Sequence, residues 1–130
     1  MAKAEVNKAK LVVIGGSSGS LQVIIHILGR LPVDYPIPVL LIIHRAYSID
    51  SLLLDLLVLK SNIRVCEVEE KEKIVPSCVY LAPADYHVLI EKDETFTLDY
   101  SEKLNFSRPS IDVSFISAAM VYGKNLAGIL

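Results

Sequence analysis

The chain has 130 residues, 52% of them apolar, and a formal net charge of −2. This length is enough for one domain with a buried core, and the slightly acidic balance argues against a nucleic-acid-binding surface, which is usually basic. No apolar run approaches the roughly 20 residues of a membrane helix, and residues 1–10 lack the apolar segment of a signal peptide. We therefore expect a cytoplasmic domain without membrane insertion.

The first expected elements are a strand, a tight turn and a helix. Residues 11–14 are all apolar, which is typical of a parallel strand covered on both faces. The turn, residues 15–20, contains G-x-S-x-G with its serine at Ser17, a spacing that presents a serine on a sharp strand-to-helix turn. Apolar residues then recur at helical spacing, and Ser18 or Ser20 is expected to cap this helix.

A second apolar strand, residues 39–43, ends directly before His44. Strand, helix and strand form a βαβ unit with parallel strands, so Ser17 and His44 both follow the carboxyl ends of strands. Open α/β sheets place their sites at that edge. Ser17 therefore fits the nucleophile of an acyl-transfer site, and His44 fits the base that takes its proton.

The remaining elements complete an α/β fold: a three-layer, mainly parallel, Rossmann-like sheet with helices on both faces and an added antiparallel hairpin. They are helices over residues 51–60 and 111–122, strands over residues 63–68, 79–81 and 126–130, and hairpin strands over residues 87–90 and 95–100.

Ser17 has two other interpretations. One is a turn serine that only caps the helix. The other is an anion or nucleotide site, because a turn of small residues before a helix binds anions. Residues 15–20 weaken this second interpretation, since they contain neither G-x-G-x-x-G in any register nor the lysine of a P-loop.

The other polar candidates have simpler expected roles. His26 falls on the polar face of a helix, His87 is expected to be structural or on the surface, with the rim of the site as the alternative, and Asp112 stabilises a helix start. Cys66 and Cys78 form no C-x-x-C pair, so we expect buried free thiols rather than zinc ligands. No metal or cofactor is expected.

Five segments, in order along the chain, match motifs of one known family. Residues 12–19 are similar to a strand and G-A-S-x-G-G turn, residues 39–44 to an apolar strand ending in histidine, and residues 79–87 to an i-A-P-g-d-y-H segment. Residues 108–113 are similar to an R-P-S-v-D-v segment, and residues 127–130 to the start of a last conserved strand. Together they resemble the catalytic domain of the CheB chemotaxis methylesterases.

The resemblance implies hydrolysis of glutamate γ-methyl esters on the cytoplasmic helices of methylated chemoreceptors, in some members with glutamine deamidation. It implies that Ser17 is the nucleophile and His44 the base. One local difference is Ser20, where the family has glycine.

The family's catalytic aspartate lies in a G-M-G-x-D-G segment beyond the last matched strand, and no residue of this sequence matches it. We therefore expect residues 1–130 to be a single methylesterase-like domain, incomplete at its carboxyl end, without a receiver domain, and weakly active or inactive as given. The alternative is a non-catalytic module that binds receptors or signalling partners on the same fold. An incomplete sheet also predicts self-association through an unpaired edge at residues 126–130.

Overall fold

The computed structural model describes residues 9–44, 50–84, 86–99 and 110–130, so Arg108 and Pro109 of the R-P-S motif and Asp85 lie outside the described residues. The longest helix there has 12 residues, and within these ranges no helix has the length and apolar character needed to cross a bilayer. The elements in chain order are β1 (Leu11–Ser17), η1 (Ser18–Ser20), α2 (Leu21–Arg30), β2 (Val39–His44), α3 (Asp50–Lys60), β3 (Arg64–Glu67), β4 (Cys78–Leu81), β5 (His87–Ile90), β6 (Phe96–Asp99), α4 (Ile111–Tyr122), η3 (Gly123–Asn125) and β7 (Leu126–Ile129).

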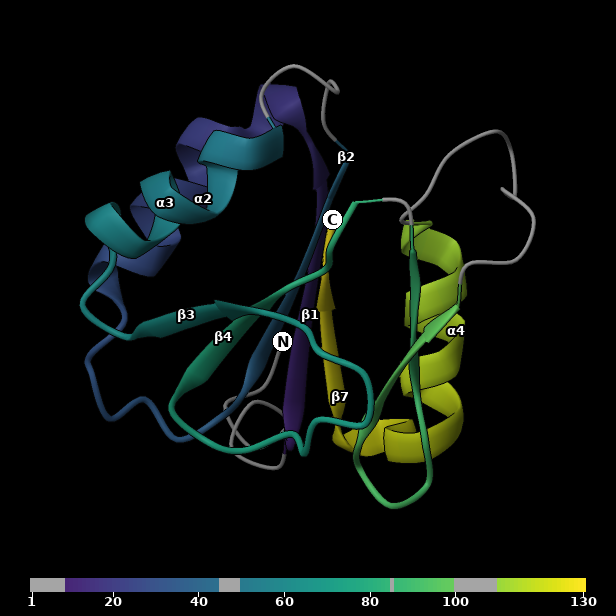
Figure 1. The fold of residues 1–130 in the computed structure, drawn as a ribbon. Helices are drawn as coiled ribbons and strands as arrows, with labels where there is room; N and C mark the ends of the chain where they lie inside the picture. The colour runs from purple at the N-terminus through teal and green to yellow at the C-terminus, as the bar shows by residue number, and fades with distance from the viewer. Residues whose placement is uncertain (1–8, 45–49, 85, 100–109) are drawn as a thin grey trace.

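A five-stranded sheet forms the centre of the molecule (Figure 1). Its strand order is β3-β4-β2-β1-β7, and every neighbouring pair is parallel. Helices α2 and α3 cover one face, whereas α4 and the antiparallel hairpin β5–β6 cover the other (Figure 1). This three-layer arrangement confirms the predicted fold class.

Alternate residues of the central strands face two separate cores. Leu11 and Val13 of β1 join the core beneath the hairpin and α4, whereas Val12 and Ile14 join the core beneath α2 and α3. A strand buried on both faces gains nothing from polar alternation. This explains the continuous apolar runs that predicted both β1 and β2.

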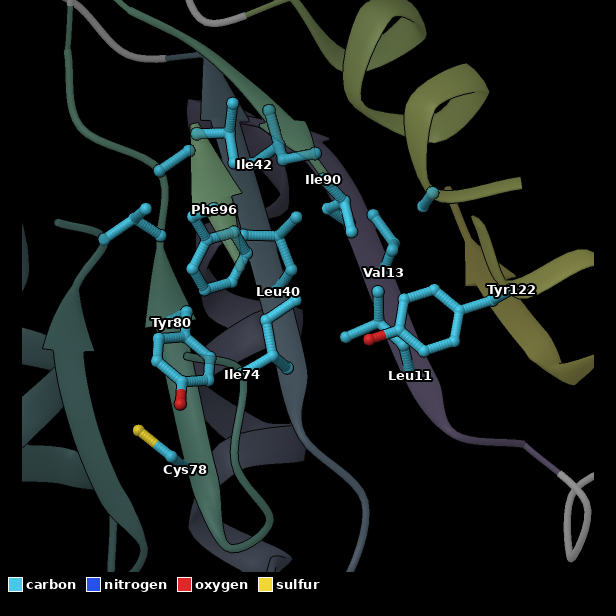
Figure 2. Close-up of a cluster of buried hydrophobic side chains, with 14 residues drawn as sticks. Leu11, Val13, Leu40, Ile42, Ile74, Cys78, Tyr80, Ile90, Phe96 and Tyr122 are labelled. Carbon is cyan, nitrogen blue, oxygen red and sulfur yellow. The ribbon is translucent and has the colours of Figure 1, made fainter. Parts of the chain in front are cut away.

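The core beneath the hairpin is centred on an aromatic pair, shown in Figure 2. The rings of Tyr80 and Phe96 meet edge to face, with centroids 4.9 Å apart, a favourable arrangement of ring quadrupoles. The Tyr80 hydroxyl accepts the N–H of Val75 at 2.9 Å and donates to the carbonyl of Lys73 at 3.3 Å. The hairpin is therefore joined to the sheet through a buried phenol whose polar atom is satisfied.

Two serines of α4 bind the backbone of the hairpin strand β5. The hydroxyl of Ser114 donates to the carbonyl of Val88 at 2.6 Å, and the N–H of Ile90 donates to the hydroxyl of Ser117 at 2.7 Å. Residues three apart lie on one face of a helix, so both hydroxyls point at the same strand. They supply hydrogen bonds that a neighbouring strand would otherwise give.

The helix ends agree only in part with the predictions. In α4 the Ser110 hydroxyl accepts the N–H of Val113 at 3.3 Å, and Gly123 ends the helix with a φ of 54°, a conformation that favours glycine. The prediction of a serine cap on α2 is wrong for Ser20, whose side chain makes no capping hydrogen bond. Its φ of −92° and ψ of 0° continue the preceding 3₁₀ turn, whereas a capping residue has extended backbone.

Strand β7 lies at one edge of the described sheet and pairs with β1. Near its end, Ile129 is 46% exposed and Leu130 is 88% exposed. Sheet edges with apolar side chains favour association with other chains, and self-association through this edge stays a prediction.

Replacement of Ser114 by alanine should destabilise the fold by about 1–3 kcal/mol, because it leaves the buried carbonyl of Val88 without its donor. Urea denaturation measures the change. The control on the same helix is Ile116→Ala, whose side chain is 62% exposed, and it should change the free energy of unfolding by no more than about 0.5 kcal/mol. Equal effects of the two substitutions would contradict the anchoring role of Ser114.

Candidate active site

Ser17 and His44 are register partners at the carboxyl ends of neighbouring parallel strands. Ser17 is the last residue of β1 and His44 the last of β2, and they pair across the ladder. Paired strands lie about 4.8 Å apart. Side chains at register partners point to the same face of a sheet, and continuing the alternation from Val13 and Ile42 places both on the face covered by α4 and the hairpin.

The two side chains differ in exposure. Ser17 is exposed and His44 is half-buried. The Nε2 atom of His44 is buried, and no hydrogen-bond partner for it is found among the described residues. Leaving a buried polar atom unpaired costs about 1–3 kcal/mol. A hydrogen bond between this nitrogen and a hydroxyl that turns toward it would therefore be favourable. Contacts between a nucleophile and its base are often long before substrate binds.

The backbone after Ser17 turns directly into a helix. The 3₁₀ turn η1 leads into α2, which begins at Leu21. The first N–H groups of a helix have no partner within it, and they carry the positive end of the helix dipole. Negative charge that develops beside Ser17 can therefore be stabilised by backbone N–H groups, as in an oxyanion hole.

Glycines let the elements around Ser17 come close together. A β-carbon on Gly15 would lie 2.7 Å from Cγ2 of Ile111 in α4, so only glycine allows α4 to pack against this part of β1. A β-carbon on Gly19 would lie 3.6 Å from the Ser17 hydroxyl oxygen, an ordinary contact. The first glycine of G-x-S-x-G is thus required by packing, and the second is not.

Gly16 and Ser20 form a tight pair on the other face of the turn. A β-carbon on Gly16 would lie 3.1 Å from the β-carbon of Ser20, closer than ordinary van der Waals contact. The turn G-A-S-x-G-G has alanine at the first of these positions and glycine at the second. This chain has the reverse, glycine and then serine, so the total number of β-carbons in the pair is unchanged.

The other candidates of the sequence have hydrogen-bond partners or positions that explain them without catalysis. His26 is exposed and accepts a hydrogen bond from Nε of Arg30 at 3.1 Å. His87 is buried, and its Nδ1 accepts the N–H of Ser110 at 3.2 Å, which favours the structural role over the surface one. Asp112 is exposed in the first turn of α4, where an acid is stabilising. No group of three or more potential metal ligands converges within the described ranges.

Sequence reasoning missed how the start of α4 is held beside the site. Ser110 both caps α4 and donates its N–H to His87 at the start of β5, and Ile111 packs on Gly15, two residues before Ser17. The sequence signals were the serine before a helical run and the two matched motifs, residues 79–87 and 108–113, which contain His87 and Ser110 but do not show that these residues meet. The partner of Ser110, His87, lies 23 residues away in the chain, beyond the reach of local pattern.

A cavity of about 420 Å³ lies at the amino ends of β1 and β2, opposite the strand ends that carry Ser17 and His44. Its lining includes Lys10, which precedes β1, Pro38, which precedes β2, and Tyr122. Burial raises the pKa of the Tyr122 hydroxyl, and the nearby Glu94 carboxylate adds to the effect. Among the described residues, the lining contains no serine, threonine, cysteine or histidine, so the carboxyl ends of the strands at Ser17 are the stronger candidate for acyl-transfer chemistry.

The comparisons with known proteins agree with one another. The sequence model of one protein family, CheB methylesterase, matches residues 12–130. A protein of Leptospira interrogans named putative protein-glutamate methylesterase/protein-glutamine glutaminase is 43% identical over 119 residues, which cover 92% of this chain and 62% of that protein. A Thermotoga maritima protein named protein-glutamate methylesterase/protein-glutamine glutaminase is 34% identical, over 93% of this chain and 36% of its own length.

A solved structure shares the fold as well. The crystal structure of the Thermotoga maritima CheB methylesterase catalytic domain superposes with a TM-score of 0.85 and 32% sequence identity. The match covers 92% of this chain and 65% of that domain. The chain thus spans less than two thirds of the length of these similar proteins.

The exchange between Gly16 and Ser20 can be tested with a double-mutant cycle. Gly16→Ala should lower the free energy of unfolding by about 1 kcal/mol more in the chain with Ser20 than in the chain with glycine at position 20. Only the combination of an alanine β-carbon at position 16 with that of Ser20 would crowd the turn. Urea denaturation of the wild type, both single variants and the double variant gives this coupling energy. The cycle cancels the intrinsic difference between glycine and alanine. Additivity within about 0.3 kcal/mol would show that the contact carries no strain.

Proposed function

This chain belongs to the CheB methylesterase family, and we propose that it carries the nucleophile and base of a protein-glutamate methylesterase. Ser17 is the nucleophile and His44 the general base. The observation that supports both assignments is their pairing in register at the carboxyl edge of the sheet. The resemblance of residues 12–19 and 39–44 to the family's serine turn and histidine strand points to the same two residues.

The proposed reaction proceeds through an acyl-enzyme. The hydroxyl of Ser17 attacks the ester carbonyl of a methylated glutamate while His44 takes the hydroxyl proton. The carbonyl oxygen gains negative charge, which the backbone N–H groups at the start of α2 stabilise. His44 then returns the proton to the leaving methanol, and water activated by the same imidazole releases the free carboxylate. With glutamine in place of the ester, the leaving group is ammonia.

The proposed substrates are the methylated cytoplasmic helices of chemoreceptors. A glutamate on a receptor helix can reach Ser17 because Ser17 is exposed at the end of its strand. On the neighbouring strand the Nε2 atom of His44 is buried, and exclusion of water strengthens electrostatic interactions with the reacting groups.

No residue of this sequence matches the family's catalytic aspartate. Such an acid holds the histidine in its reactive tautomer, and losing it in serine proteases lowers the rate by about 10⁴. We therefore propose that ester hydrolysis by this chain as given is slow. The same observation favours a second candidate function, a non-catalytic module that binds receptors or signalling partners on the methylesterase fold.

A fluorophosphonate probe tests the activated serine. We expect it to label Ser17 and to leave Ser17→Ala unlabelled. Labelling of His44→Ala should be slower by about 100-fold, because no base removes the hydroxyl proton. Ser20→Ala is the matched control, since it removes another hydroxyl of the same turn and should label like the wild type. Mass spectrometry of the modified peptide gives the position and the rate.

Two outcomes of the labelling would contradict the assignments. Wild-type labelling of His44→Ala would show that His44 is not the base. A complete lack of labelling in every variant would favour the binding module over the enzyme.

Methanol release from a methylated chemoreceptor tests the reaction itself. We expect release that depends on Ser17 and is slower by about 10⁴ than release by the Thermotoga maritima catalytic domain. Equal rates would show that the residues present suffice for full activity. Receptor binding by both the wild type and Ser17→Ala, with no methanol from either, would support the non-catalytic alternative.

A further inference from the structure

Two cysteines on neighbouring strands lie with their sulfur atoms in contact. Cys66 of β3 and Cys78 of β4 are both free, and their Sγ atoms are 3.4 Å apart. In the parallel ladder Cys66 pairs with Tyr80, two residues after Cys78. The two cysteines are therefore diagonal neighbours on one face of the sheet, where side chains two residues apart point the same way.

The pair is reachable from one side. Cys78 is buried, whereas Cys66 is partly exposed on β3, which is an edge strand of the described sheet. A small reagent would therefore approach the pair from the side of Cys66. The sequence predicted buried free thiols; both cysteines are free and Cys78 is buried, but Cys66 is only partly buried.

The charges and hydrogen bonds around the sulfurs favour one thiolate in the pair. The pKa of Cys78 is lowered to about 7, chiefly because its sulfur is hydrogen-bonded to Cys66, and the same hydrogen bond raises the pKa of Cys66. The interaction with the Tyr80 side chain and the positive charge of Arg64 contribute to the lowered pKa of Cys78, whereas burial and the Glu72 carboxylate oppose them. Thiolate is the form that reacts with oxidants and disulfides.

We propose that Cys66 and Cys78 are a reversible dithiol–disulfide site that a small peroxide oxidises. The sulfurs must approach from 3.4 Å to about 2.05 Å. Strand β3 has no other strand of the described sheet on its outer side, so a small shift that brings the sulfurs together disturbs the β3–β4 ladder alone. The site lies on the side of β2 remote from Ser17, so the proposal is independent of the methylesterase chemistry.

The chemistry balances with hydrogen peroxide as the oxidant. A thiolate of the pair attacks one peroxide oxygen, the O–O bond breaks, and a sulfenic acid and hydroxide form. The second thiol then attacks the sulfenic sulfur, the S–S bond forms, and water leaves with the thiol proton. Two thiols lose two electrons in all, and one peroxide is reduced to two waters. A dithiol reductant reverses the step by thiol–disulfide exchange.

The test is peroxide treatment of the folded chain of residues 1–130 near neutral pH, followed by unfolding, alkylation with N-ethylmaleimide and measurement of the intact mass. Before treatment both cysteines should be alkylated. Afterwards neither should be alkylated, the mass should lie about 2 Da below that of the reduced, unalkylated chain because two hydrogens are lost, and one linked peptide pair should contain Cys66 and Cys78. Dithiothreitol should restore both thiols. The linkage should form at least about tenfold faster in the folded chain than in urea, because the fold holds the sulfurs together.

Cys66→Ser and Cys78→Ser are the matched variants, with folding checked by circular dichroism. Each should stop at a sulfenic acid that dimedone traps, without an internal crosslink. Two outcomes would overturn the proposal: sulfinic acid on Cys66 with Cys78 still alkylated, or a crosslink that forms no faster in the folded chain than in urea. If a serine variant fails to fold, the comparison of folded and urea-treated wild type decides alone.

Discussion

The parallel pairing of β1 with β2 is the constraint on which the rest of this structure depends. Strand β1 is paired on both sides, with β2 and with β7, and its side chains enter two cores. Because one ladder runs from Val12 opposite Val39 to Ser17 opposite His44, the candidate site is set by the same register that fills both cores. A shift of one residue would exchange the buried faces of the strand. The packing of both cores therefore also maintains the pairing of Ser17 with His44.

The second constraint is the close approach of α4 to β1 and to the hairpin. Gly15 leaves room for Ile111, and the hydroxyls of Ser114 and Ser117 bind the backbone of β5. A hairpin outside the main sheet has unpaired backbone groups on its edges, and burying those groups without partners is costly. The two serine hydroxyls provide hydrogen-bond partners for these backbone groups, and their short side chains let the helix and the strand lie close together. The start of α4 is thereby placed beside the edge that carries Ser17.

The turn around Ser17 shows how a motif can change its residues and keep its volume. The family pattern has a β-carbon at the position of Gly16 and none at the position of Ser20, and this chain has the reverse. The two positions face each other, so the space available to them is shared. Ser20 is therefore explained by packing and not by capping, since its side chain makes no capping hydrogen bond. A hydroxyl near a helix start does not by itself identify a cap.

The sequence alone determined the elements and the edge of the sheet that bears the candidate site. Apolar runs, helical spacing and turn residues are local signals, so the helix ended by Gly123 and the apolar strands 11–14 and 39–43 were predictable from the chain itself. The structure extends these two strands to Ser17 and His44. Only the tertiary structure decided which strands are neighbours. Strand order depends on contacts between segments far apart in the chain, and it brings Cys66 within 3.4 Å of Cys78. The register of Ser17 with His44 was decided in the same way, because a ladder is chosen by the packing of both its faces.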